Sequence, residues 1–115
     1  MIIKNLKNNK CLSQHAEVAK TPFSRAKGLI GRQSLEPGQG LVITSCNSIH
    51  MFFMSVAIDV VFIDRRGVVV GLVEEIKPNQ MSSVFWKATC AIELPIGTIK
   101  QTETSVGDVI EIKAF

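Results

Sequence analysis

The sequence predicts a mainly β domain, and three observations lead to that prediction. Isoleucine and valine number 13 and 12 against 7 leucines, and branched side chains suit a pleated strand better than a helix. Short apolar runs alternate with turn-forming residues along the chain. Apolar residues make up 46% of the chain and charged residues 20%. This composition is sufficient to form a hydrophobic core and excludes an intrinsically disordered chain. We therefore expect one domain over residues 1–115, a sandwich or small barrel of about eight short strands.

The first third of the chain is predicted to hold a half-buried strand followed by the one helix. Residues 11–19 alternate in polarity, with Leu12 and Ala16 on the inner face, and a period of two indicates a strand. Thr21 supplies a side-chain oxygen for a helix N-cap, and Pro22 suits the first helical position. The short helix is therefore expected near residues 22–31.

The remaining elements follow as short apolar runs between turns. Arg65, Arg66 and Gly67 form a tight turn between two such runs, which predicts a β-hairpin. The other turns are expected at residues 37–40 and 95–97. The expected strands, besides 11–19, are residues 2–3, 41–43, 57–64, 68–76, 88–94 and 109–113, with a helical turn within 97–105.

The charge of the chain is unevenly distributed. The formal net charge is +3, but residues 1–32 carry seven Lys or Arg and only Glu17, whereas residues 33–115 carry six against nine acids. A basic end can face a phosphate-rich partner. Its only aromatic residue is Phe23, however, and base stacking needs several aromatic residues along a basic groove. A solvated basic face is favoured, and weak nucleic-acid binding through the basic N-terminal third remains an alternative.

The three cysteines indicate a reducing compartment. Cys11, Cys46 and Cys90 are odd in number, widely spaced and without a Cys-x-x-Cys or zinc pattern. Cys11 is expected to be reachable, and Cys90 is expected to be a small core residue. No apolar run is long enough to span a membrane, and residues 1–10 show no signal peptide. We therefore expect a cytoplasmic protein without membrane contact.

One set of residues has the chemistry of a metal site. Cys46, His50 and Met54, with Met51, are the soft sulfur and imidazole ligands that copper(I) prefers. In an extended strand, four residues span about 13 Å, whereas metal ligands converge to about 2 Å from one ion. Only a bend or a helical turn in the chain would bring these ligands together. Core packing is favoured for these residues, and neither a metal nor another cofactor is expected.

Asp59 interrupts the most apolar run of the sequence, residues 56–63. A buried carboxylate needs a cation and hydrogen-bond donors, or it takes up a proton. The fork of an arginine can hold both oxygens, and Arg25 and Arg32 lie on one side of the expected helix. A structural ion pair between Arg25 and Asp59 is favoured over a general base or ligand anchor.

The order and spacing of three motifs resemble those of a known family. Residues 25–32 (RAKGLIGR) resemble an opening R-x-x-G-L-M-x-R motif, and residues 51–59 (MFFMSVAID) resemble M-K-N-T-x-x-P-L-D. Residues 92–97 (IELPIG), with Gly107 and Asp108 ten residues on, resemble a closing L-E-L-P-x-G and G-D pair. The chain is thus similar, over about residues 12–113, to the "domain of unknown function 192" family.

This resemblance implies a fold but no activity, because the family has none established. It implies a jelly-roll-like, mainly β domain with a short helix after the first long strand. Many members have an export signal, which we do not expect for this chain. His50 stands where tryptophan is usual, and Phe52 and Phe53 replace a polar Lys-Asn pair, so any ligand site here is more apolar. Arg25 and Asp59 match motif positions.

Three functions follow from these observations. The first is a non-enzymatic binding or accessory module that holds a partner protein or a small apolar ligand. The second is an enzyme with Asp59 and His50 as acid–base groups and Arg25 as an anion holder, which requires all three in one cleft. The third is the weak nucleic-acid binder. The residues predicted for the binding surface are His50, Met51, Phe52, Met54 and Glu93.

Overall fold

The computed structural model describes residues 1–19, 35–51 and 54–114. The helix predicted over residues 22–31 lies outside these residues. The same holds for Arg25, Arg32, Phe52 and Phe53. The described part confirms the mainly β fold, and its elements match most of the expected runs. They are β1 (Ile2–Asn5), β2 (Lys10–Ser13), β3 (His15–Ala19), β4 (Gln39–Thr44), β5 (Ile58–Ile63), β6 (Val69–Ile76), β7 (Cys90–Pro95), α2 (Thr98–Gln101) and β8 (Ile110–Lys113).

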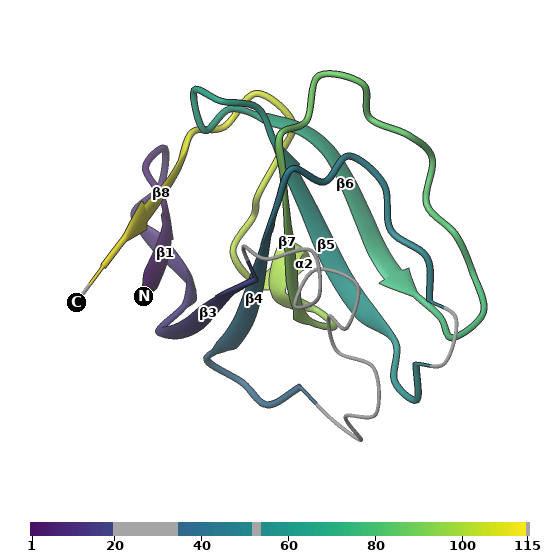
Figure 1. The fold of residues 1–115 in the computed structure, drawn as a ribbon. Coiled ribbons are helices and arrows are strands. Elements are labelled where there is room, and N and C mark those ends of the chain that lie inside the picture. Colours follow the sequence, from purple (N-terminus) through teal and green to yellow (C-terminus); the bar gives the residue numbers. More distant parts are fainter. Residues whose placement is uncertain (20–34, 52–53, 115) are drawn as a thin grey trace.

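The strands form two sheets. In the larger sheet the described strands lie in the order β3-β4-β7-β5-β6, and in the smaller one in the order β2-β1-β8. All pairs are antiparallel except β3 and β4, which run parallel with His15 opposite Gln39. The small sheet lies at one side of the molecule, where the first and last strands pair and both termini meet (Figure 1).

Two apolar clusters cover the two faces of the large sheet. Successive residues of a strand point to opposite faces, and Val60 and Phe62 lie in one cluster whereas Val61 and Ile63 lie in the other. The first cluster is completed by the connections around Ile49, Met51 and Ala88. The second cluster is completed by the small sheet and α2 through Ile3, Leu12, Ile99 and Ile110. The sheet is therefore buried on both sides, which explains its nearly continuous apolar strands.

The predicted hairpin is confirmed as β5 and β6. At its turn, Oδ1 of Asp64 accepts hydrogen bonds from the backbone N–H groups of Arg66 (2.8 Å) and Val68 (3.0 Å). Burial acts to raise the pKa of Asp64, but these bonds and the Arg66 guanidinium lower it overall. Gly67 has φ +81°, and a Cβ there would lie 2.7 Å from the carbonyl oxygen of Ile110. The hydrogen bonds to Asp64 explain the carboxylate at the start of this turn. The positive φ and the close carbonyl of Ile110 explain the glycine at position 67.

Residues 11–19 differ from the prediction, because they form two strands in two sheets. β2 ends at Ser13, and β3 begins at His15. The backbone N–H groups of Gln14 and His15 both donate to the carbonyl oxygen of Gly38 at 2.9 Å, which bends the chain from one sheet to the other. The expected alternation therefore breaks: Ser13 is buried and Gln14 is exposed, although Leu12 and Ala16 point inward as predicted.

The helical turn expected within residues 97–105 is α2, which begins after Gly97 at φ +87°. No described helix is long and apolar enough to cross a membrane.

Candidate binding surface

Asp59 lies in the middle of the large sheet, on the face covered by α2. Its residue is fully buried, at 0% exposure. Oδ1 accepts a hydrogen bond from the backbone N–H of Glu75 (2.9 Å), and Oδ2 accepts one from that of Ile99 (3.0 Å). The carboxylate therefore attaches both α2 and β6 to β5. The predicted partner Arg25 lies outside the described residues.

The Asp59 contact explains an irregularity in β6. Val60 pairs with Val73 and Ile58 with Ile76, so Asp59 stands opposite both Glu74 and Glu75. This is a β-bulge, in which the extra residue leaves the regular ladder. Glu75 has φ +51°, its N–H donates to Asp59, and both glutamates are exposed. In a regular strand the two side chains would face opposite sides of the sheet, whereas the bulge makes them face solvent together.

His50 lies in the connection after β4, on the opposite side of the large sheet from the Asp59 carboxylate. Its neighbours Ile49 and Met51 pack in the first cluster, whereas the Asp59 carboxylate bonds the N–H of Ile99 in the second. His50 itself is exposed and forms a β-bridge with Met81. The structure thus does not bring Asp59 and His50 together.

The other residues predicted for the binding surface differ in exposure. Met51 is 1% exposed and belongs to the core, and Glu93 is 4% exposed on β7. Met54 is partly buried against the first cluster. Of the described members of this set, His50 is therefore the one that is exposed. Phe52 lies outside the described residues.

The loop between β6 and β7 is held beside residues 47–51 by regular backbone contacts. Met51 N–H donates to Gln80 O (2.8 Å), and Asn79 N–H donates to Met51 O (2.9 Å). Further along, Phe85 N–H donates to Asn47 O at 2.8 Å. Bonds at both ends of this segment fix its backbone, so its outward side chains are presented on a defined scaffold.

This loop exposes three large apolar side chains. Trp86 is 84% exposed, Met81 is 68% exposed, and Val84 is also exposed. We call Met81, Val84 and Trp86 the Trp86 surface. Phe85 points the other way, with its ring centroid 4.5 Å from that of Phe62 in the core. Both aromatic residues belong to the turn closed by the hydrogen bond from Ala88 N–H to Phe85 O (2.8 Å), and their side chains leave it in different directions.

The residues predicted from the sequence for the binding surface do not include Phe85 or Trp86. The available signal is the surrounding sequence, because Ser82, Ser83 and Lys87 flank a short apolar stretch without strand periodicity. Such a stretch belongs to a loop, where consecutive side chains cannot all be buried.

Metal and thiol chemistry are limited in the described residues. No three His, Cys, Asp or Glu side chains within residues 1–19, 35–51 and 54–114 lie close enough to hold a metal ion. Cys11, Cys46 and Cys90 form no disulfide, and Cys11 is exposed as predicted. Burial raises the pKa of the Cys90 thiol, and the nearby Cys46 thiol raises it further. Cys90 is therefore a poor nucleophile.

The described N-terminal lysines are partly neutralised by acids from the far end of the chain. Lys7 Nζ lies 3.4 Å from Oδ1 of Asp108, and Lys10 forms an ion pair with Glu103. The hydrogen bond from Lys10 and its charge lower the pKa of Glu103. The charge imbalance seen along the sequence is therefore reduced in the folded chain.

The described fold is a two-sheet β domain in which residues 92–95 (IELP) lie on the central strand β7 and Gly107 and Asp108 precede β8. This arrangement defines the class of the protein. The chain belongs to the domain of unknown function 192 family, whose model, described as "Uncharacterized ACR", matches residues 3–112.

Two curated relatives carry the name UPF0127 protein. One, from Thermococcus sibiricus, is 31% identical over 115 residues and covers 96% of this chain and 73% of its own length. The other, from Pyrococcus abyssi, is 35% identical over 101 residues, or 83% of each chain. Neither name states an activity.

Two solved structures share the fold. A protein of unknown function from Novosphingobium aromaticivorans superposes with a TM-score of 0.83 at 17% identity, covering 96% of this chain and 82% of that one. A protein from Sinorhizobium meliloti superposes with a TM-score of 0.80 at 22% identity, covering 96% and 89%. The latter is called a transcription regulator by name only, and identities this low show the fold alone.

Proposed function

We propose that this domain is a non-enzymatic binding module and that it holds a partner protein on the Trp86 surface. The observation that carries the proposal is the exposure of Trp86, at 84%, on a loop fixed by backbone hydrogen bonds. Tryptophan is enriched among the residues that dominate binding energy at protein interfaces. A rigid scaffold lowers the entropy lost when the side chain is immobilised in a complex.

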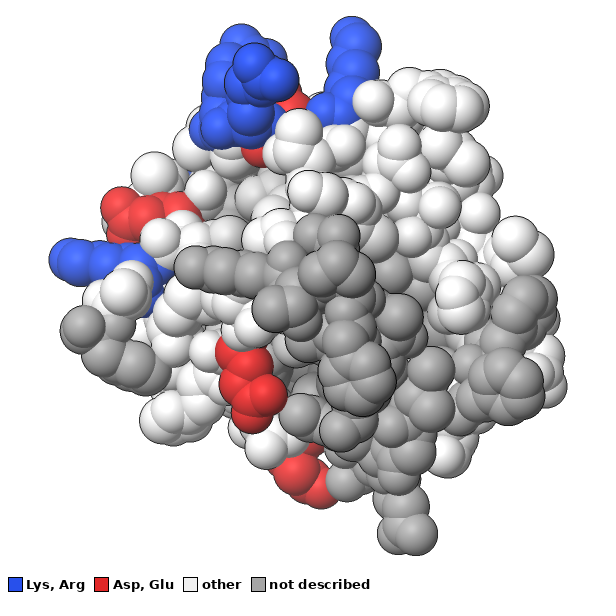
Figure 2. All heavy atoms as spheres, viewed as in Figure 1, with Lys and Arg blue, Asp and Glu red and all other residues white. Residues whose placement is uncertain are grey.

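The shape and charge of the region favour a protein over a small ligand. Small-molecule sites are concave and enclose most of their ligand, whereas Trp86 projects from a turn. The part of Figure 2 over β6 is mostly uncharged, while the exposed charges of this region, Glu74, Glu75, Lys77 and Lys87, flank the Trp86 surface along the chain. Depletion of charge is typical of interface centres. His50, through its bridge to Met81, lies at the edge of this surface.

The two other functions have less support. An enzyme with Asp59 and His50 in one cleft is not supported by their positions on opposite sides of the sheet. Nucleic-acid binding through the N-terminal third is weakened by the pairing of Lys7 and Lys10 with acids. We also propose a cytoplasmic location, which the absence of disulfides among the three cysteines supports.

The test begins with a photoreactive phenylalanine analogue placed at position 86 or at position 96, in cells of the source organism. Ile96 is exposed as well but follows the opposite end of β7. Any protein cross-linked from position 86 is then purified, and its affinity is measured for the wild-type chain, Trp86→Ala and Ile96→Ala.

We expect cross-linking from position 86 only, and a loss of affinity of about 30-fold or more for Trp86→Ala, as for an interface residue worth about 2 kcal/mol. Ile96→Ala should bind within about twofold of wild type. Equal cross-linking from both positions, no adduct from position 86, or full affinity of Trp86→Ala would each refute the proposal.

A further inference from the structure

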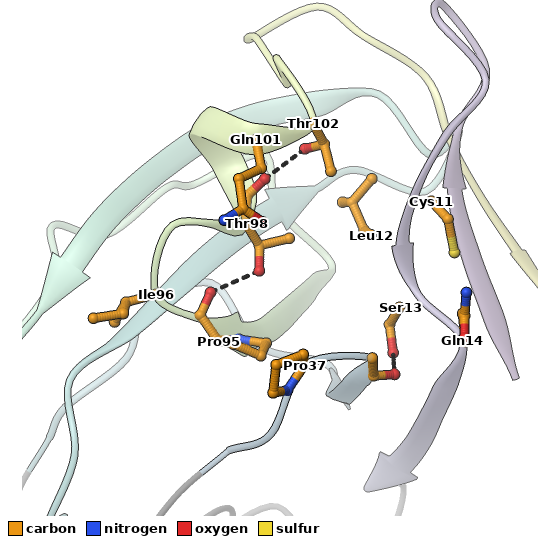
Figure 3. A pocket seen from close by; sticks show the side chains of 11 residues that line it. Cys11, Leu12, Ser13, Gln14, Pro37, Pro95, Ile96, Thr98, Gln101 and Thr102 are labelled. Atoms are coloured by element: carbon orange, nitrogen blue, oxygen red, sulfur yellow. Dashed lines mark hydrogen bonds between the residues drawn. The ribbon is translucent and has the colours of Figure 1, made fainter.

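A pocket lies between β2 and α2, on the opposite side of the large sheet from residues 47–51. Its volume is about 380 Å³, near the small end of the range for small-molecule sites. One wall is formed by Cys11 to Gln14, and the other by the end of β7 and by α2 (Figure 3). Pro37 and Gly38 also line the pocket. No residue of the Trp86 surface takes part, so the site is independent of the proposed function.

Contacts beside the pocket hold its walls in place. The side-chain N–H of Asn8 donates to Thr102 O (2.8 Å), and Ser13 Oγ donates to Gly38 O at 2.8 Å. The volume of about 380 Å³ suits a compact ligand.

The described lining of the pocket contains no charged residue. A carboxylate, phosphate or ammonium group placed there would lose hydration without gaining an opposite charge, which is costly. The ligand that fits is therefore uncharged.

The hydroxyl groups of the lining have a fixed hydrogen-bonding character. Ser13, Thr98 and Thr102 each donate their hydrogen to a backbone carbonyl, of Gly38, Pro95 and Thr98 at 2.8, 2.7 and 2.7 Å. A hydroxyl whose hydrogen is already used can only accept another bond. Thr102 Oγ1 also lies 2.7 Å from Thr104 Oγ1, and Ser13 is 1% exposed. Thr98 is therefore the lining hydroxyl that can accept a bond from a donor on the ligand.

The rim offers the complementary groups. Gln14 and Gln101 are exposed, and neither side-chain amide bonds another described residue. Each amide supplies two N–H donors and a carbonyl acceptor. Leu12, Pro37 and Pro95 add apolar surface between the polar groups. A ligand must therefore both donate and accept hydrogen bonds around an apolar carbon frame.

We propose that this pocket binds a compact, uncharged polyhydroxyl compound of monosaccharide size. Hydroxyl groups of such a ligand both donate to Thr98 and accept from the glutamine amides. The carbon frame of such a ligand contacts the prolines and Leu12. No covalent step is involved.

Cys11 provides the readout, because its exposed thiol lies in the pocket wall whereas Cys46 and Cys90 are partly buried. The rate of Cys11 alkylation by iodoacetamide is followed by peptide mass spectrometry during titration with glucose, N-acetylglucosamine or myo-inositol. Gluconate at equal concentration is the charged control and corrects for viscosity. The rate at Cys90 is the internal control.

We expect at least one neutral polyol to slow alkylation of Cys11 several-fold and saturably, with no change at Cys90. Gln101→Ala should raise the half-saturating concentration about fivefold through the loss of one hydrogen-bonding group. Lys100→Ala, which changes an exposed neighbour outside the lining, should leave it unchanged. Absence of saturable protection, equal protection by gluconate, or insensitivity to Gln101→Ala would overturn the proposal.

Discussion

The side-chain amide of Asn5 donates a hydrogen bond to Oδ2 of Asp108, 2.9 Å away, although the two residues lie 103 positions apart. Both side chains are buried, and Asn5 Oδ1 also accepts the backbone N–H of Lys7 at 3.0 Å. The backbone N–H of Ser105 bonds the same Asp108 oxygen at 2.9 Å. This cluster fixes the turn after β1 against the loop that precedes β8.

Asn5→Ala should destabilise the domain by about 1–3 kcal/mol, because a buried carboxylate loses a charge-assisted hydrogen bond. Urea unfolding at neutral pH measures the change. Glu111→Gln, an exposed substitution on β8, serves as the control and should change stability by less than about 0.5 kcal/mol. A similar loss in both variants would contradict the role assigned to Asn5.

Asp108 should also make stability depend on pH. Burial acts to raise the pKa of Asp108, but hydrogen bonds from Asn5 and Ser105 and the charge of Lys7 lower it overall. A carboxyl with a lowered folded-state pKa contributes its full stability above the unfolded value of about 3.9 and loses it as the pH falls through the folded value.

The unfolding free energies of wild type and Asp108→Asn should therefore converge as the pH is lowered from 6 to 2.5. Urea titrations at half-unit intervals give this difference directly. A gap that stays constant, or that widens in acid, would show that the Asp108 charge is not linked to folding.

Asp59→Asn should cost about 1–3 kcal/mol, because an amide can accept only one of the two backbone hydrogen bonds that the carboxylate accepts. The N–H groups of Glu75 and Ile99 should exchange with deuterium faster, while that of Val61 on the same strand should change less. Native-state hydrogen exchange by NMR resolves the three amides. Unchanged protection of both Glu75 and Ile99 would contradict the fastening role of Asp59.

Gly71→Ala should destabilise by about 1–3 kcal/mol through overpacking. An added Cβ would lie 2.3 Å from the ring of Phe85, which packs over Gly71 and against Phe62. In a Phe85→Ala background the same substitution should cost nothing. A double-mutant cycle measures this coupling, and additive effects would show that the contact does not restrict position 71.

Local pattern and turn chemistry predicted the hairpin of β5 and β6 because both signals are contained within 20 residues. The break at Gln14 was not predictable in this way, because it depends on Gly38, which is distant in sequence. Asp59 could be identified as anomalous from its apolar neighbours. Its two described partners are backbone groups, however, and a sequence carries no sign of which N–H groups lie near.

The candidate surface was predictable only in part, for a related reason. His50 was identified from its chemistry and is exposed. The exposure of Trp86 depends on the conformation of one turn. The same local sequence is compatible with Phe85 pointing outward and Trp86 inward. The pocket beside α2 joins residues 11–14, 37–38 and 95–102, which are more than 20 residues apart from one another, so no local window contains it.

The pairing of β1 with β8 has a consequence for synthesis on the ribosome. Ile2 lies opposite Lys113, so the small sheet cannot close until the last strand has left the exit tunnel. Contacts of such sequence separation carry the entropy of closing a long loop and slow folding. Until then, Ile3 and its neighbours in the second cluster lack part of their cover. The nascent chain therefore passes through a state in which one face of the large sheet is exposed to chaperones.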